Sequence, residues 1–188
     1  MTDVYNLGGG RADAWAGPIG LANAAMLAPM AGVTDLGMRR AAWRFGATLV
    51  FSEMVAGGAL LDGDEEARLR AEGEGVGLHA AQLVGCAPKA MAEAARRVEA
   101  AGARLIDVNM GCPARRVAGA LAGAALMRDL DAAARVVAAV AAAVDAPVSV
   151  KMRLGWDEAT INAPALARRV VEAGAAMVTV HARTRRQF

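Results

Sequence analysis

The sequence predicts an α/β fold in which helices cover a parallel sheet, and three observations support this. Predicted strands and helices alternate along most of the chain. The strands are continuous apolar runs rather than alternating ones, which is typical of parallel strands that are buried on both faces. Polar residues recur directly after the strands, where parallel α/β proteins place their functional groups.

Apolar runs bounded by Gly, Pro or polar residues predict six strands, at residues 24–28, 48–52, 78–84, 105–108, 147–152 and 176–180. Ala-rich and amphipathic stretches predict helices at residues 35–44, 64–70, 88–101, 117–127, 131–144 and 162–173. Thr34 or Asp35 can cap the first helix, and Pro88 and Gly102 mark the two ends of the third. We expect residues 1–18 to form a loose lead-in.

Two architectures fit alternating strands and helices. A doubly wound nucleotide-binding sheet would carry a Gly-x-Gly-x-x-Gly turn after its first strand, and the sequence has neither that turn nor a P-loop. A (β/α)₈ TIM barrel fits the polar residues after the strands better. A complete barrel has eight units in about 250 residues. We therefore expect residues 19–188 to form a partial TIM barrel of about six units, with the C-terminal units absent.

Composition narrows the function classes. The chain has 188 residues, of which 56% are hydrophobic, and a net charge of +2 that does not by itself indicate nucleic-acid binding. Its two cysteines, Cys86 and Cys112, have no metal-site spacing, so we expect no metal. No secretory signal is visible, and the most apolar segment, 132–148, is interrupted by Arg135 and Asp145. We expect a cytoplasmic protein with reduced thiols and no membrane association.

Cys112 is the first candidate functional residue. It follows the strand at 105–108 and lies between Gly111 and Pro113, which stops the strand from continuing. We expect residues 109–111 to turn the chain sharply and to present the thiol at an exposed tip. A small apolar residue in a tight turn is an equally good interpretation of this stretch alone. Further polar residues lie near or just after the ends of the predicted strands, namely Thr34, Glu53, Gln82, Asn109, Lys151, Arg153 and His181.

Six short segments occur in one order across residues 19–188: LAPMAGVTD (27–35), SEM (52–54), AQL (81–83), DVNMGCPA (107–114), VKMRLGW (150–156) and VHART (180–184). In these segments the chain resembles the tRNA-dihydrouridine synthase family, in particular its bacterial B-type branch. The resemblance implies an FMN-dependent barrel enzyme that reduces the C5–C6 double bond of uridines in tRNA, with NADPH as the reductant.

The resemblance also implies roles for individual residues. Cys112 would be the proton donor, since a thiol with an ordinary pKa of about 8.5 is mostly protonated at neutral pH. Lys151 would place its charge against the N1/O2 edge of the flavin, Asn109 would contact the uracil, and Arg153 would face the substrate or the flavin pocket. The remaining residues expected to bind FMN are Pro29, Met30, Ala31, Gln82 and His181.

Arginines that follow the predicted strands suggest a basic rim for tRNA, formed by Arg115, Arg116, Arg153, Arg183, Arg185 and Arg186. The family places its FMN-phosphate site in the last two barrel loops and most of its tRNA-docking helices after the barrel. We expect neither here, and therefore expect weak FMN binding and low activity from this chain alone. Two alternatives stay open: a flavin barrel acting on free pyrimidines, of the dihydroorotate or dihydropyrimidine dehydrogenase kind, or a non-catalytic fragment.

Overall fold

A computed structural model describes residues 15–16, 19–23, 25–119 and 121–187, and its main feature is a curved parallel sheet. Six of the described strands follow one another in the sheet in chain order, from β3 to β8. The strands are β1 Trp15–Ala16, β2 Ile19–Gly20, β3 Met26–Leu27, β4 Leu49–Ala56, β5 His79–Val84, β6 Leu105–Met110, β7 Val148–Arg153 and β8 Ala175–His181. The helices are α1 Leu36–Arg44, α2 Gly57–Leu61, α3 Glu65–Ala71, α4 Pro88–Ala100, α5 Arg115–Gly119, η1 Gly123–Arg128, α6 Leu130–Ala141, η2 Glu158–Thr160 and α7 Ala163–Glu172.

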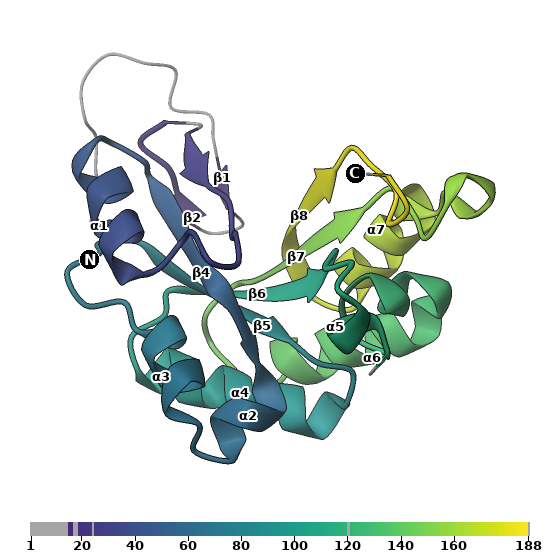
Figure 1. Ribbon diagram of the computed structural model, residues 1–188, viewed down its shortest axis with the longest axis horizontal. Helices are drawn as coiled ribbons and strands as arrows, with labels where there is room; N and C mark the ends of the chain where they lie inside the picture. Colours follow the sequence, from purple (N-terminus) through teal and green to yellow (C-terminus); the bar gives the residue numbers. More distant parts are fainter. Residues whose placement is uncertain (1–14, 17–18, 24, 120, 188) are drawn as a thin grey trace.

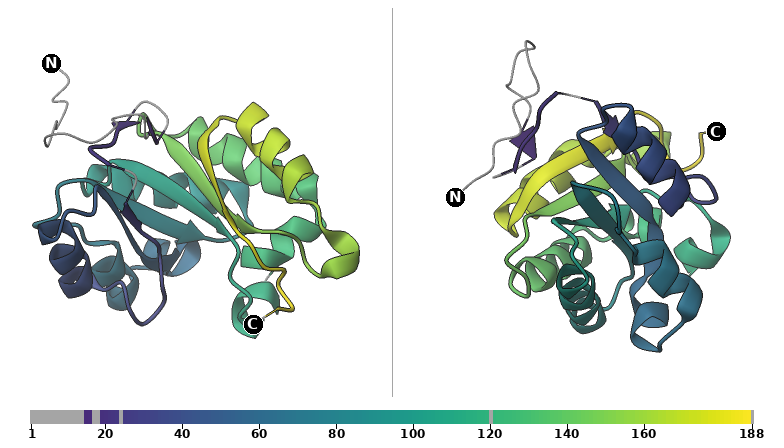
Figure 2. Two further views of the ribbon diagram at one scale, coloured as in Figure 1. Left: turned by 90° about the horizontal axis from the view of Figure 1, so that it is seen from above. Right: turned by 90° about the vertical axis from the view of Figure 1, so that its left-hand side faces the viewer.

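The sheet curls into part of a barrel with helices on its outer face, which confirms the predicted partial TIM barrel (Figure 1). The main core lies between this outer face and the helices, where Val108 and Val150 pack with Val136 and Leu166. Figure 2 shows from two further sides that helices cover only one face of the sheet. Since helices cover a single face, the curvature leaves the other face to line the barrel interior.

The inner face of the sheet is apolar only at the amino-terminal ends of its strands. There Leu49, Phe51, Ala80 and Leu105 form a second core with Leu21, which lies just after the β1–β2 hairpin. Most of the predicted lead-in over residues 1–18 lies outside the described residues. Its last described part, β1, pairs antiparallel with β2.

Several predicted boundaries were wrong. β4 continues to Ala56 and is followed by α2, a helix that was not predicted because the sequence there is rich in glycine. Packing accounts for this helix, since Leu60 is buried and a Cβ at Gly57 would lie 3.3–3.4 Å from Met91 and Ala94 of α4. The first predicted strand is reduced to β3, and its residue 24 lies outside the described part.

β6 is longer than predicted and the segment after it is divided. The strand runs through Asn109 and Met110, which we expected in a turn, because both pair in parallel register with β7. The single helix predicted at 117–127 is instead α5 followed by η1, with Leu121 at a positive φ of 58° between them. A β6 that ends at Met110 moves the bend to Gly111 and places Cys112 beyond it.

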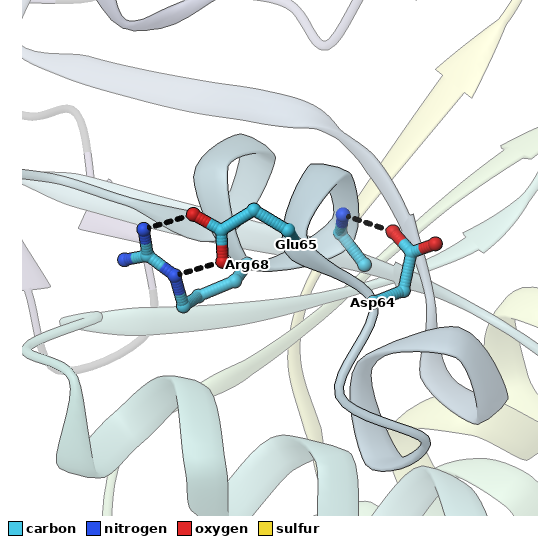
Figure 3. A network of polar contacts seen from close by, with 4 residues as sticks. Asp64, Glu65 and Arg68 are labelled. Carbon is cyan, nitrogen blue, oxygen red and sulfur yellow. Dashed lines mark hydrogen bonds and ion pairs between the residues drawn. The ribbon is translucent and has the colours of Figure 1, made fainter.

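Capping follows the sequence signals. Asp35 caps α1 by accepting a hydrogen bond of 2.8 Å from the Met38 N–H, so Asp35 rather than Thr34 is the cap. Figure 3 shows the same device at α3, where Asp64 accepts from the Ala67 N–H at 2.7 Å. In the first turn of the same helix Glu65 and Arg68 form a bidentate ion pair, but both side chains are exposed and add little stability.

Arg39 is a completely buried charge that ties α1 to the segment after α3. Its Nε donates to the carbonyl of Thr34 at 3.0 Å, and Nη1 donates to the carbonyl of Glu72 at 2.6 Å. Nη2 donates to the carbonyl of Arg70 at 3.2 Å, and Nη1 also lies 3.2 Å from Nδ1 of His79. Because a buried guanidinium is costly without partners, these bonds fix the helices around the start of β5.

The arginine also sets the tautomer of His79. Nδ1 must accept from Arg39, so the ring proton lies on Nε2, which donates to the carbonyl of Ala71 at 2.9 Å. Burial, with help from the charge of Arg39, lowers the pKa of His79 to about 4. The neutral imidazole is therefore the form that the folded protein accommodates.

This environment predicts an acid sensitivity. Between about pH 6.5, where His79 titrates when unfolded, and pH 4, the unfolded chain binds more protons, so stability falls as the pH falls. His79→Gln keeps one acceptor and one donor but does not titrate. Denaturant unfolding across this range should show that the wild type loses about 3 kcal/mol more than the variant. Asp107 has the opposite effect on the pH dependence of stability, because its pKa is raised in the folded state, but this effect is the same in the wild type and in His79→Gln. Equal slopes of stability against pH in the two proteins would therefore contradict the prediction.

Candidate functional site

Polar side chains occupy the inner face toward the carboxyl ends of the strands. In β6, Asp107 and Asn109 alternate with the outward-facing Val108, and in β7 Ser149 and Lys151 alternate with outward-facing apolar residues. The register aligns Gln82, Asp107 and Ser149 in one row of neighbours, and Asn109 and Lys151 in the next. β6 and β7 are therefore not the uniformly apolar strands expected from the sequence.

Asp107 is the centre of the first row and was not predicted as a site residue. It is 1% exposed, and it accepts hydrogen bonds from the Ser149 hydroxyl at 2.5 Å and from Nε2 of Gln82 at 2.6 Å. Burial raises its pKa to about 6, while these two bonds and the charge of Lys151 act against that rise. The alternation of polar and apolar residues along β6 was the signal in the sequence that could have identified it.

Asn109 connects this row to the cysteine loop. Its Nδ2 donates to Oε1 of Gln82 at 2.8 Å, and its Oδ1 accepts from the N–H groups of Gly111 at 3.1 Å and Cys112 at 2.9 Å. Cys112 is half-buried rather than fully exposed as expected, and the carbonyl of Cys112 also accepts from the Ala124 N–H at 3.0 Å. Hydrogen bonds thus hold both the N–H and the carbonyl of Cys112.

Lys151 and His181 bring nitrogen donors to the same end of the sheet. The Lys151 ammonium is half-buried and forms no hydrogen bond or ion pair with the residues that the structure describes. Burial lowers its pKa, partly offset by the charge of Asp107. His181, at the end of β8, pairs in register with Arg153, and slight burial and the neighbouring cations Arg153 and Lys151 lower its pKa. Lys151 and His181 therefore bring to this face two nitrogen groups whose pKa values are both lowered.

Arg153 connects the cysteine loop to the segment after β8. Its Nε donates to the carbonyl of Gly111 at 2.8 Å, and its Nη1 donates to the carbonyl of Thr184 at 2.8 Å. Burial lowers the pKa of Arg153, and the Cys112 side chain has an opposing effect, as expected for close neighbours. The cysteine loop is therefore held through the carbonyl of Gly111 by Arg153, in addition to its N–H bonds to Asn109.

A second arginine reinforces this connection. The guanidinium of Arg185 lies 4.8 Å from the ring centre of Trp156 and that of Arg128 lies 5.0 Å from it, both within cation–π range. Arg185 also lies 3.4 Å from the carbonyl of Pro113. The predicted basic rim is therefore smaller than expected, because Arg153 and Arg185 are half-buried and engaged. Its exposed members are Arg115, Arg116, Arg183 and Arg186.

The turn at residues 29–34 lies beside β4. The Met30 carbonyl accepts from the Thr34 N–H at 3.0 Å, and the buried Thr34 hydroxyl lies 3.0 Å from the Met30 N–H. Gly32, at a φ of +74°, donates its N–H to Glu53 at 2.6 Å. Since Met30 is 40% exposed, core packing does not account for it, and the cofactor role of Pro29, Met30 and Ala31 stays a prediction.

A cavity of about 480 Å³ lies at the carboxyl ends of β4 and β5 and is also lined by α2, by α3 and by Arg116 and Val117 of α5. Arg116 of the predicted basic rim therefore lines it, whereas none of the residues predicted to bind FMN or the uracil does. No cluster of metal-binding side chains occurs in the part of the chain that the structure describes. None of the helices in that part is long and apolar enough to cross a membrane.

Comparison with known sequences gives a consistent result. A family model described as dihydrouridine synthase (Dus) matches residues 26–188. Proteins named probable tRNA-dihydrouridine synthase from Rhizobium leguminosarum bv. phaseoli and Rhodobacter capsulatus are 51% and 53% identical, over 88% and 87% of this chain. A tRNA-dihydrouridine synthase B from Xanthomonas campestris is 46% identical over 91% of the chain. These alignments cover 52%, 51% and 52% of the relatives, so the chain spans about half the length of the curated relatives it matches.

Solved structures share the fold at low sequence identity. Histamine dehydrogenase from Rhizobium sp. 4-9 matches with a TM-score of 0.53 at 17% identity, over 74% of this chain and 33% of its own. Pyruvate carboxylase from Rhizobium etli matches with a TM-score of 0.51 at 20% identity, over 74% of this chain and 12% of its own. At these identities the likeness concerns the fold alone.

The connection made by Arg153 predicts the reactivity of Cys112. Arg153→Lys keeps a positive charge but cannot bond both Gly111 and Thr184 as the planar guanidinium does. The loop should loosen, and Cys112 should be alkylated by iodoacetamide several-fold faster, measured by mass spectrometry with Cys86 replaced by Ser. Arg115→Lys, an exposed change in the neighbouring helix α5, should leave the rate unchanged. An unchanged or slower rate in Arg153→Lys would show that the connection does not restrain the loop.

Proposed function

Because the chain belongs to the dihydrouridine synthase family, we propose that it carries the catalytic face of an enzyme that reduces uridine in tRNA to dihydrouridine. FMN is the proposed cofactor and NADPH the proposed reductant. The observation that supports this most directly is the position of Cys112. Its backbone is fixed at the carboxyl ends of the strands by Asn109, which pairs in register with the half-buried Lys151.

The reaction adds a hydride and a proton to the C5–C6 double bond of the uracil ring. Cys112 gives the proton, and its thiol needs a fixed position because general acid catalysis depends on placing the donor within hydrogen-bond distance. Two backbone N–H bonds to Asn109 and the Arg153 bond to Gly111 supply that fixed position. Arg153, whose positive charge interacts with the Cys112 side chain, also lies close to the proposed donor.

The residues present fit the ring of FMN. A flavin, when bound, supplies the hydride. Lys151 offers an ammonium that bonds none of the described residues, and Gln82 has one N–H and one oxygen lone pair beyond its bonds to Asp107 and Asn109. These groups suit the donors and acceptors on the pyrimidine edge of the flavin. His181 and residues 29–31 are the proposed further contacts with the ring system.

The substrate side uses a different set of groups. Asn109 and Arg153 are proposed to face the base, and Nη2 of Arg153 is the part of its guanidinium that bonds no described residue. A base within folded RNA must be extruded at a cost of a few kcal/mol, which contacts to phosphates help to offset. The exposed arginines beside the site are the proposed phosphate contacts, namely Arg115, Arg116, Arg183 and Arg186. With tRNA as the proposed substrate, the cytoplasm is the proposed location.

The proposed activity belongs to a protein of the length of the relatives. A chimera can test it, in which this chain is joined to the part of the Rhizobium leguminosarum relative that it does not cover. This chimera should bind FMN and form dihydrouridine in tRNA lacking it, whereas this chain alone should bind FMN weakly. Turnover of free uracil or dihydroorotate instead of tRNA would favour a free-pyrimidine enzyme.

The proton-donor role predicts the effect of removing the thiol. In the chimera, Cys112→Ala should leave FMN absorbance unchanged and lower the rate of dihydrouridine formation by roughly 10²–10⁴-fold, the usual contribution of a general acid. Cys86→Ala, which changes a cysteine outside the proposed site, should retain activity. Full activity in Cys112→Ala would exclude the proton-donor role.

The charge of Lys151 predicts an electrochemical effect. A reduced flavin carries negative charge near N1, so Lys151→Met should lower the reduction potential of bound FMN by tens of millivolts. The potential can be measured against redox dyes in the chimera. Lys89→Met, which removes an exposed lysine of α4, serves as the control. An unchanged potential in Lys151→Met would place the ammonium away from the ring.

A further inference from the structure

The cysteine loop fixes the orientation of Asn109. The N–H groups of Gly111 and Cys112 both point at one atom of this side chain, at 3.1 and 2.9 Å. Two N–H donors require an acceptor, so that atom is the amide oxygen. The amide nitrogen of Asn109 must then point away from the loop, toward Gln82.

The same reasoning fixes Gln82. Since Asn109 presents its nitrogen, Gln82 must present its oxygen to it, 2.8 Å away, and must turn its own nitrogen toward Asp107, 2.6 Å away. Each side-chain amide has one donating and one accepting end. The orientation of the group at either end of this row of hydrogen bonds therefore determines the direction of every bond in it. The main chain of Gln82 is held as well, because its N–H donates to the Ser52 hydroxyl at 3.0 Å.

The carboxylate of Asp107 is the last member of this row of hydrogen bonds, because a carboxylate can only accept. Asp107 takes one hydrogen bond from Gln82 and one from Ser149, and at 1% exposure it has no access to water as an alternative partner. Burial raises the pKa of Asp107 to about 6, which still leaves the carboxyl ionised at pH 7.

We propose that Asp107 is a positioning residue that sets the direction of hydrogen bonding through Gln82 and Asn109, and thereby holds the backbone of Cys112. The hydrogen-bond direction is independent of the reaction. Only its consequence for proton delivery rests on the function proposed above. A residue that merely fills space at position 107 would hold the loop equally well whatever its hydrogen-bonding character.

Reversing the direction of hydrogen bonding distinguishes a positioning role of Asp107 from a space-filling one. In Asn109→Asp the new carboxylate still accepts from the loop, but its second oxygen faces the oxygen of Gln82. Turning the Gln82 amide would only move the conflict, since the Gln82 oxygen would then face Asp107. Adding Asp107→Asn removes the conflict: the amide at position 107 donates to Gln82 and accepts from Ser149, and Gln82 donates to the carboxylate at position 109. The proposal therefore requires that the second substitution rescue the first.

The test uses the chain as it is, without flavin or tRNA, so its outcome is independent of whether the proposed reaction occurs. The single variants, the double variant and the wild type are compared by thermal unfolding and by amide hydrogen exchange at Cys112. Asp107→Asn should lower Tm by at most about 2 °C, because its amide can donate to Ser149 and still accept from Gln82. Asn109→Asp should lower Tm by about 5 °C and speed exchange at Cys112 about tenfold.

The double variant should return to within about 2 °C of Asp107→Asn, with slow exchange restored. If Asn109→Asp does not fold, recovery of folding in the double variant is the same result. Asn23→Asp is the matched control, since exposed Asn23 also accepts from a backbone N–H and donates to a carbonyl, and Asp107→Asn should not rescue it. A double variant no better than Asn109→Asp, or an Asn109→Asp variant that matches the wild type, would overturn the proposal.

Discussion

The buried carboxylate of Asp107 is the constraint on which the polar half of the inner face depends. A carboxylate withdrawn from water costs several kcal/mol unless its oxygens are bonded, and removing one partner leaves the charge uncompensated. Ser149 and Gln82 supply those bonds, and Lys151 supplies an opposite charge nearby. Because Gln82 is also bonded to Asn109, the residues of the site form one unit whose members cannot be exchanged independently.

The second buried charged cluster has a different construction. Arg39 donates chiefly to backbone carbonyls, around the first residue of β5, and so fixes the path of the main chain. The Asp107 cluster joins side chains to one another, nearer the carboxyl ends of the strands. The two clusters thus follow the division known for TIM barrels, in which the amino-terminal face provides stability and the carboxyl-terminal face provides chemistry. Ligand binding at the Asp107 cluster need not disturb the Arg39 cluster.

Much of the fold could be predicted from the sequence, because strand runs and helix signals are local. The order of elements and the partial barrel are confirmed. The helix α2 could not be predicted, since its glycines disfavour a helix and packing against α4 overrides that preference. At the site, residues after successive strands were expected to gather at one edge, and Gln82, Asn109 and Lys151 do so.

The sequence did not predict which side chains form hydrogen bonds with one another. Asp107 and Ser149 are 42 residues apart, and so are Arg153 and Gly111, so nothing local reveals either pair. Arg153 was expected to face a ligand and to form part of the basic rim, yet most of its donors are engaged by loop carbonyls. Such pairings depend on register between strands, and register is a property of the assembled sheet.

The strand order of the sheet has a consequence for how the protein forms. Each strand from β4 onward pairs with the strand that precedes it in the chain, so every pairing joins neighbouring β/α units. Contacts between neighbours close short loops and can form early. As the chain leaves the ribosome, each new unit can dock onto a finished edge. The loop that carries Cys112 would then gain its last support late, when β8 arrives and the carbonyl of Thr184 meets Arg153.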